Sequence, residues 1–556
     1  MASNKMSRNE RESRATDITH DTVPTGIAGL DTILQGGVRK GNIILVEGAP
    51  GTGKTTLGLE FIYRGAKEYD EPGLVVSFEL SPQKLLRDAA GFGWDFKSLE
   101  ESGKVKVIYT SPLVILQELN SHDGVLANEI KRIGAKRFVI DGLTPLKVFG
   151  ELFNGRPFRD SLHLLVEGLQ RMNVTAVLTR ELTLSGGPMS SDTGHEQFVC
   201  DTVISLKQRS YRRGMNRSIE VTKSRGQEFI SGQHTMRIVG SSGVQVFNRP
   251  QARPREITEQ PTSTKRISTG SKELDQLVGG GVFEGSITLA VGISGTGKTV
   301  SGVQFLMEGV RKGRRGLLVT LDEHEAQLIR NAEGLGFKLA SAVKDGDVII
   351  HYDAPLELEL DVHFHDIVNL IEKHKIDLVV IDSLAAYEAA DENESRDFIY
   401  ALATYFKNNL ITAYFNYETP ELLGISQISE NLKASTIVDN IILLNYVEIS
   451  TQLRRAITVP KARGSRPDHR TREFEIGPGG IRILEDHEGE AGSVEKVPQL
   501  PFSAYYGILA RSPSRRSPIV ESYVNAGASM PRSAMPKAKA SSGRKPVSRG
   551  KKSRKH

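Results

Sequence analysis

The chain has 556 residues, of which 38% are hydrophobic and 25% charged, a globular composition that excludes disorder along its whole length. No uncharged apolar run approaches the roughly 18 residues of a membrane span, and the start of the chain lacks the apolar stretch of a secretory signal, so we expect a cytoplasmic protein. The net charge of +5 combines an acidic body with a basic C-terminal tail, and the length predicts two large domains or several small ones.

Residues 1–20 are polar and of mixed charge, which indicates a flexible N-terminal tail. Over residues 21–248, short apolar runs alternate with helical stretches, and the runs are NIILVEG, GLVVSFEL, RFVID, TAVLTRE and DTVISLK. This alternation predicts an α/β domain with a mostly parallel sheet and helices on both faces. Strands covered on both faces are apolar at successive residues, as these runs are.

The first run leads into GAPGTGKT, which matches the phosphate-binding loop G-x-x-x-x-G-K-[ST] between a predicted strand and a predicted helix. Its glycines permit a backbone path whose N–H groups form an anion site at a helix N-terminus, so we expect it to bind the phosphates of ATP. Lys54 is expected to reach the β- and γ-phosphates, and Thr55 to bind Mg²⁺. The predicted ATP-binding residues are Gly48, Gly51, Thr52, Gly53, Lys54, Thr55 and Thr56.

Two later strands of this domain end in carboxylates. Asp141 ends RFVID, where a carboxylate at the C-terminal edge of the sheet can hold the metal through water. Glu79 lies at the end of GLVVSFEL and is the candidate base that orients or deprotonates the attacking water. The single cysteine, Cys200, is interpreted as a small buried apolar residue.

Residues 249–265 hold three prolines and many polar residues, which is typical of an interdomain linker, and a second copy of the domain then occupies residues 266–487. The lysines of the two phosphate-binding loops are 244 residues apart, and Asp382 follows Asp141 by 241. Such nearly constant offsets indicate duplicated domains. In the second copy the predicted ATP-binding residues are Gly292, Gly295, Thr296, Gly297, Lys298 and Thr299, with Thr299 and Asp382 at the metal.

The candidate base differs between the copies. VSFEL of the first copy becomes VTLDE in the second, so Asp322 aligns with Glu79 and Glu323 aligns with Leu80. Either carboxylate of the second copy can reach an attacking water, and the sequence does not decide between them.

Residues 488–556 form the last segment. From residue 511 onward it holds 13 lysine or arginine residues and one acidic residue, a net +12 that leaves −7 for residues 1–510. It is rich in Ser, Gly and Pro and nearly free of large apolar groups, so we predict that it is mostly disordered. Such a tail can attract nucleic acid, anionic lipid or an acidic protein, although a solvated solubility tail is at least as good an interpretation.

From about residue 23 to about residue 483 the chain resembles the KaiC family, tandem RecA-like ATPases and autokinases of the cyanobacterial clock. The most specific stretches are IDSLAA, STIVDNIILLNYVEI and RAITVPKARGS. The resemblance implies two RecA-like P-loop domains in a homohexameric double ring with ATP between neighbouring subunits. It also implies that Lys223, Arg225, Lys461 and Arg463 reach the γ-phosphate of ATP bound by the adjacent subunit, where cations stabilise the transferring phosphoryl group.

The family's autophosphorylation pair falls on Ser435 and Thr436. The first copy has Gln197 and Phe198 at these positions, so only the second copy has the hydroxyls. The resemblance therefore implies that the first domain mainly hydrolyses ATP, while the second also transfers the γ-phosphoryl group to Ser435 and Thr436 of its neighbour.

Three positions depart from the family pattern. Leu80 and Asp322 stand where the family usually has glutamates, and Glu430 stands where it has a further threonine. A clock role is therefore not implied, and we expect an ATP-state-dependent signalling or timing component with an unidentified partner protein.

Two other functions compete with this one. A RecA-like DNA-dependent ATPase is weaker because the body of the chain is acidic and shows no basic strip interleaved with aromatic residues. A scaffold that uses ATP only to assemble is the other alternative, and Glu79 argues against it.

Overall fold

The computed structural model describes residues 22–120, 124–147, 158–182, 195–211, 214–250, 261–355, 358–390, 394–419, 437–449 and 452–484. The predicted N-terminal tail, the C-terminal tail, most of the linker and the Ser435–Thr436 pair lie outside these residues. Within the described part of the chain, no helix is long and apolar enough to cross a membrane.

The first half of the chain folds around a nine-stranded sheet in the order β11-β10-β9-β8-β3-β7-β6-β4-β5. The strands from β8 to β5 in this order are parallel, and β9, β10 and β11 extend the sheet in antiparallel fashion. The strands are β3 (Ile43–Gly48), β4 (Gly73–Ser77), β5 (Val105–Tyr109), β6 (Arg137–Asp141), β7 (Thr175–Glu181), β8 (Thr202–Tyr211), β9 (Gly214–Ser224), β10 (Gln233–Val239) and β11 (Gly243–Phe247).

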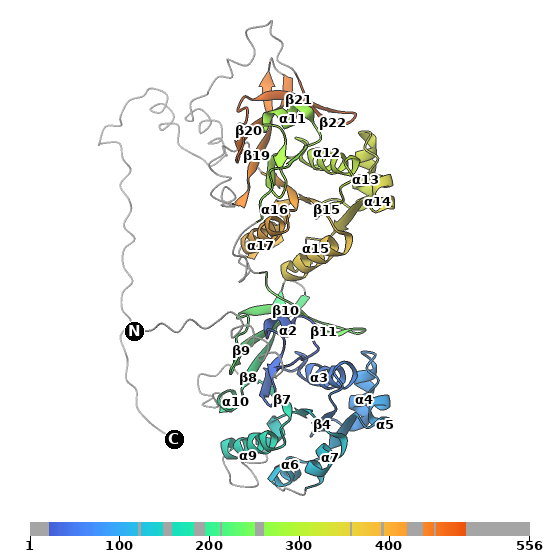
Figure 1. The fold of residues 1–556 in the computed structure, drawn as a ribbon, viewed down its shortest axis with the longest axis vertical. Coiled ribbons are helices and arrows are strands. Elements are labelled where there is room, and N and C mark those ends of the chain that lie inside the picture. The colour runs from blue at the N-terminus through green and yellow to red at the C-terminus, as the bar shows by residue number, and fades with distance from the viewer. Residues whose placement is uncertain are drawn as a thin grey trace, which may run out of the picture. The chain divides into compact units, whose positions relative to one another are not determined.

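Helices cover both faces of this sheet (Figure 1). One face packs against α3 (Lys54–Glu68), α4 (Pro82–Ala90) and α5 (Phe96–Glu101), and the other against α6 (Pro112–Asn120), α7 (Val125–Ile133) and α9 (Phe158–Arg171). The remaining elements are short and comprise α2 (Leu30–Ile33), α10 (His195–Val199) and the two-stranded pair β1 (Thr22–Val23) and β2 (Val38–Arg39).

The central strand β3 shows why its sequence is apolar throughout. Ile44 and Val46 belong to the core on the α3 face, while Ile43 and Leu45 belong to the core on the α9 face. Each core is filled from alternate residues because side chains of a strand point to opposite faces. The predicted α/β class, with a mostly parallel sheet covered on both faces, is confirmed here.

The second half repeats this arrangement with the sheet order β16-β15-β17-β18-β14-β19-β20-β21-β22, and its strands from β16 to β19 are parallel. Its strands are β14 (Ile287–Gly292), β15 (Gly316–Thr320), β16 (Val348–Tyr352), β17 (Leu378–Asp382), β18 (Thr412–Glu418), β19 (Asn440–Ile449), β20 (Gln452–Ala462), β21 (Arg472–Gly477) and β22 (Gly480–Ile483). Before β14 in the chain, β12 (Arg266–Ile267) and β13 (Val282–Phe283) form a separate two-stranded antiparallel sheet.

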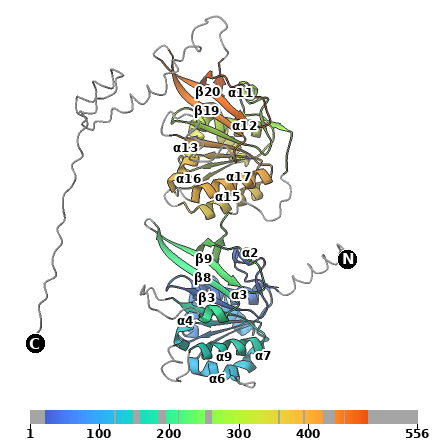
Figure 2. The same cartoon turned by 90° about the vertical axis from the view of Figure 1, so that its left-hand side faces the viewer.

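Helices again line two faces of the sheet (Figure 2). The core on one face contains residues of α15 (Leu360–His374), α16 (Leu384–Ala390) and α17 (Glu394–Asn408). The core on the other contains residues of α11 (Lys272–Leu277), α12 (Lys298–Arg311), α13 (Glu325–Gly334) and α14 (Leu339–Asp345). The two halves are therefore copies of one fold.

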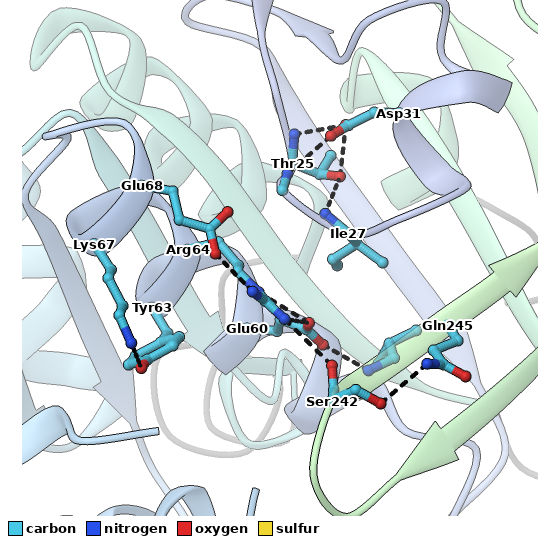
Figure 3. A network of polar contacts seen from close by, with 12 residues as sticks. Thr25, Ile27, Asp31, Glu60, Tyr63, Arg64, Lys67, Glu68, Ser242 and Gln245 are labelled. Carbon is cyan, nitrogen blue, oxygen red and sulfur yellow. Dashed lines mark hydrogen bonds and ion pairs between the residues drawn. The ribbon is translucent and has the colours of Figure 1, made fainter. Parts of the chain in front are cut away.

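A polar network fastens α3 to the far end of its sheet (Figure 3). Glu60 of α3 is 1% exposed and accepts a hydrogen bond of 2.7 Å from the backbone N–H of Val244 in β11. Arg64, one turn later, pairs with Glu60 at 3.3 Å and donates to the carbonyl of Ser242 at 3.3 Å. These contacts hold the helix that begins at the phosphate-binding loop.

Cys200 is fully buried, as the sequence predicts. Burial raises the pKa of its thiol to about 12. The thiol is therefore protonated at neutral pH and is a packing group rather than a nucleophile.

Candidate functional site

The two phosphate-binding loops connect β3 to α3 and β14 to α12, and their glycines are required by the backbone path. Gly53 and Gly297, each directly before the helix, have φ of +104°. A Cβ at Gly53 would lie 2.5 Å from Cδ1 of Ile238, and one at Gly297 would lie 2.6 Å from Cδ1 of Ile476. The positive φ strains any residue other than glycine, and glycine also avoids these close approaches, so it suits the backbone path into the helix N-terminus.

The lysines of the two loops fold back on their own loops. Lys54 Nζ donates to the carbonyl of Ala49 at 2.9 Å, and Lys298 Nζ donates to the carbonyl of Ile293 at the same distance. Burial lowers the pKa of Lys54, while the carboxylates of Glu181, Asp141 and Glu79 act in the opposite direction. Each ammonium group therefore lies against the phosphate-binding loop of its own copy.

The hydroxyl of each loop's threonine meets the aspartate at the end of a neighbouring strand. Thr55 Oγ1 lies 3.0 Å and 3.1 Å from the two carboxylate oxygens of Asp141. Thr299 forms the equivalent hydrogen bond to Asp382. Burial raises the pKa of both aspartates, and these hydrogen bonds offset part of the increase. A hydroxyl beside a carboxylate is a set of hard oxygen donors, which fits Mg²⁺.

Glu79 lies two residues beyond the end of β4, beside the residue that follows Asp141. A Cβ built on Gly142 would be 3.7 Å from Glu79 Oε1. The chain turns here because the hydroxyl of Ser77 accepts a hydrogen bond from the backbone N–H of Leu80 at 3.1 Å. Glu79 is thus exposed at the same edge of the sheet as the phosphate-binding loop.

The second copy makes the same turn, since Thr320 Oγ1 accepts from the backbone N–H of Glu323 at 3.2 Å. The side chains of its two carboxylates then diverge. Asp322 accepts a hydrogen bond of 3.3 Å from Ser383, which follows Asp382, whereas Glu323 accepts one of 3.0 Å from Asn331 of α13. Burial raises the pKa of both carboxyl groups. Both lie at the same edge of the sheet as the phosphate-binding loop, so despite their different partners both remain candidate bases.

Two glutamates that the sequence analysis missed lie beside the lysines. Glu418, at the end of β18, pairs with Lys298 at 3.3 Å, and Glu181, at the end of β7, is the carboxylate that most favours the charged form of Lys54. Their separation of 237 residues matches the repeat, and this offset is the signal that would have identified them. Tyr446 is a third residue at the site that was not predicted from the sequence. Its hydroxyl donates to the carbonyl of Gly295 in the second phosphate-binding loop at 2.7 Å.

The Lys-x-Arg segments lie at the opposite edge of each sheet from the phosphate-binding loop of the same copy. Ser224, between Lys223 and Arg225, pairs with Thr202, which is level with Ile44 at the start of β3. The loop begins four residues further along, about 13 Å at 3.3 Å per residue. The second copy has the same register, with Ala462 paired to Asn440 and Asn440 level with Thr288.

The cations at this edge are held by backbone carbonyls and an aspartate. Lys223 Nζ donates to the carbonyls of Gln197 and Cys200 at 2.6 Å each, and Lys461 Nζ donates to that of Val438 at 2.7 Å. The arginines pair with equivalent aspartates, Arg225 with Asp201 at 3.4 Å and Arg463 with Asp439 at 3.3 Å. The structure therefore brings the loops, Asp141, Asp382 and the candidate bases together, but places these four cations elsewhere within one chain.

Comparison with known proteins agrees with the two repeated domains and their phosphate-binding loops. The family model "ATPase: KaiC" matches residues 23–251 and 267–488. The circadian clock oscillator protein KaiC of Picosynechococcus sp. is 35% identical over 500 residues, covering 89% of this chain and 92% of that protein. The KaiC of Thermostichus vulcanus is 35% identical over 484 residues, covering 86% and 91%, and the KaiC 1 of Synechocystis sp. is 33% identical over 502 residues, covering 89% and 92%. With two RecA-like domains that each carry a complete phosphate-binding loop, this chain belongs to the KaiC family of ATPases.

Proposed function

We propose that the protein hydrolyses ATP at both copies and phosphorylates itself on Ser435 and Thr436, as an ATP-state-dependent signalling component. The observation that carries the proposal is the pair of matched sites, each with a loop lysine, a threonine–aspartate pair and a carboxylate at one edge. KaiC relatives over most of the chain support the same reaction class.

Each group then has a role in phosphoryl transfer. The loop N–H groups and Lys54 or Lys298 bind and orient the ATP phosphates. Thr55 with Asp141, and Thr299 with Asp382, would hold Mg²⁺, which supplies charge neutralisation on the phosphates when bound. Glu79 takes the proton of the attacking water in the first copy, and Asp322 or Glu323 takes the proton of the attacking water or hydroxyl in the second. The water or hydroxyl oxygen bonds to the γ-phosphorus while the bond from that phosphorus to the β–γ bridging oxygen breaks, which gives phosphate or a phosphorylated hydroxyl and ADP as the leaving group.

We further propose a homohexamer with ATP at subunit interfaces, because the Lys-x-Arg cations lie too far from the loop of their own copy. An adjacent subunit's Lys223 and Arg225, or Lys461 and Arg463, would complete each site and stabilise charge on the transferring group. The acceptor pair directly precedes Ile437 and Val438, whose carbonyl accepts from Lys461. Because the acceptor hydroxyls and these cations are close together in the chain, we expect both to face the ATP that the adjacent subunit binds.

The test is mass spectrometry of the purified full chain after incubation with Mg·ATP, together with ATP turnover. Phosphate is expected on Ser435 and Thr436, and none on a Ser435→Ala/Thr436→Ala variant that still hydrolyses ATP. A Glu79→Gln variant should lose hydrolysis in the first copy, by roughly 10²-fold or more, while keeping the phosphate label. Active hydrolysis with no label on the pair would remove the kinase, and unchanged turnover in Glu79→Gln would remove Glu79 as the base.

A further inference from the structure

A cluster of two histidines and an aspartate lies in the second copy, separate from the phosphate-binding loop. His351 is in the edge strand β16, Asp353 follows that strand, and His363 is in the first turns of α15. His351 Nε2 lies 3.1 Å and His363 Nδ1 lies 2.5 Å from the same oxygen of Asp353, Oδ2. Within the described residues, this is the group of His, Cys, Asp and Glu side chains whose ligand atoms converge, all within 4.8 Å of one another.

The surroundings of the cluster match those of a metal ligand set. His363 is 1% exposed, and its other ring nitrogen, Nε2, lies 2.8 Å from the hydroxyl of Tyr387, which is fully buried. A metal-binding histidine nearly always has a hydrogen-bond acceptor on its second nitrogen, which fixes the ring and its tautomer, and a tyrosine hydroxyl can serve as one. Here, Nδ1 is directed at Asp353 and Nε2 at the tyrosine.

The opposite side of the cluster is open. The side chains of His351 and Asp353 are 20% and 36% exposed, so solvent reaches the cluster and can supply a further ligand. Two imidazoles and a carboxylate are a donor set for Zn²⁺ and related divalent transition metals, whereas Mg²⁺ prefers oxygen donors only.

The first copy provides an internal comparison. Val319 pairs with His351 as Val76 pairs with Ile108, so Ile108 and Thr110 occupy the positions of His351 and Asp353. Isoleucine and threonine at these positions are compatible with the same strand ends, so the fold does not require the histidine or the aspartate. The cluster is therefore an addition to the second copy.

We propose that His351, Asp353 and His363 bind one divalent transition-metal ion of the zinc class, with solvent completing the coordination and Tyr387 orienting His363. The ion joins the end of β16 to the first turns of α15. A network in which Asp353 only accepts N–H hydrogen bonds from both rings is the competing interpretation, and the two differ in metal affinity.

The experiment uses tag-free full-length protein, stripped with a chelator and kept in excess Mg²⁺ so that sites at the phosphate-binding loops are filled. Titration with Co²⁺ is expected to give one equivalent per chain, with a visible d–d absorption band that Zn²⁺ abolishes by displacement. His351→Ile and Asp353→Thr, which install the residues of the first copy, should eliminate the band. Tyr387→Phe should retain it with affinity lower by about 10- to 100-fold.

The matched control is His324→Ala. His324 is exposed and contacts Tyr352, which lies in β16 like His351, but His324 itself is outside the cluster. This variant should bind Co²⁺ like the unaltered chain. Nucleotide binding checks that each variant is folded. A chain that takes up no Co²⁺ under these conditions, or one whose band persists in both His351→Ile and Asp353→Thr, would overturn the metal site in favour of the hydrogen-bonded network.

Discussion

Glu60 is a buried carboxylate whose protonation is coupled to folding. Burial raises its pKa to about 7, although the Val244 N–H and Arg64 favour the charged form. A carboxyl group that binds a proton more tightly when folded stabilises the folded state at low pH, and this contribution is lost as the pH rises from about 4.5 through 7. The corresponding residue of the second copy is Gln304, which accepts from the backbone N–H of Ile481 at 2.8 Å in the same way.

We therefore predict that Glu60→Gln flattens the pH dependence of thermal unfolding between about pH 4.5 and 7 and raises the unfolding temperature at pH 8. The difference in the free energy of unfolding across this range should be up to about 3 kcal/mol. Calorimetry of the full chain at several pH values measures it. The reciprocal variant, Gln304→Glu, should introduce a pH dependence, and an unchanged profile in both variants would contradict this assignment.

Residues at strand ends show what the sequence could and could not predict. The two loops and the aspartates Asp141 and Asp382 were found because a fixed motif and a constant offset define them. Glu418 shares a constant offset with Glu181 but lies in no motif, and its position beside the site depends on a 3.3 Å approach to Lys298 that only the fold shows. The His351 cluster was missed for the same reason, since its members meet only when β16 and α15 fold together.

At the level of elements, the apolar runs predicted the parallel strands, but their ends shifted. GLVVSFEL was predicted as one strand, whereas β4 ends at Ser77 because the Ser77 hydroxyl bonds to the N–H of Leu80 and turns the chain. The antiparallel extension by β9, β10 and β11 was not anticipated, because alternating polar strands at a sheet edge resemble surface segments in sequence. That extension matters, since β10 packs Ile238 against the start of α3.

Gly53→Ala should therefore disable the first phosphate-binding loop. The added Cβ would meet Ile238 Cδ1 at 2.5 Å, and the positive φ costs a non-glycine residue about 1–2 kcal/mol in addition. We expect loss of one of two nucleotide sites per chain in equilibrium binding with a fluorescent ATP analogue. Gly53→Ala/Ile238→Ala should recover part of the affinity by removing the clash while the backbone strain remains. Full affinity in the single variant would show that this glycine is not required.

At the scale of the whole molecule, the register of β8 and β9 places the backbone of the Lys-x-Arg segment about 13 Å along the strand direction from the start of the loop of the same copy, and the register of β19 and β20 repeats this. The sequence pattern placed the ends of the parallel strands at one edge of the sheet, but it did not give the antiparallel register that puts the Lys-x-Arg segments at the other edge. The family resemblance implies that these cations act on the ATP of an adjacent subunit, and the strand register is the observation that supports this proposal.

A mixing experiment tests whether sites are shared between subunits. Lys298→Ala removes a loop lysine, and Lys461→Ala/Arg463→Ala removes the cations, so each variant alone should lose turnover in the second copy. Equal mixing in one ring should restore about a quarter of the complete sites, because a site needs an intact loop from one subunit and intact cations from the next. ATP turnover after co-assembly measures this, with each variant alone as control. Mixed rings without recovery would place both parts in one subunit.

In the proposed hexamer, the position of the loop and the cations at opposite edges of the sheet would make ATP turnover depend on assembly. A monomer would bind ATP but would have no complete active site, so the specific ATPase activity should fall when the protein is diluted. A variant subunit that lacks both the loop lysine and the cations of one domain would inactivate two ATP sites in that ring, its own and that of one neighbouring subunit. A mixture of unaltered and variant subunits would therefore lose a larger fraction of its ATP turnover than the fraction of variant subunits. This would be a dominant-negative effect, and its structural cause would be the strand register.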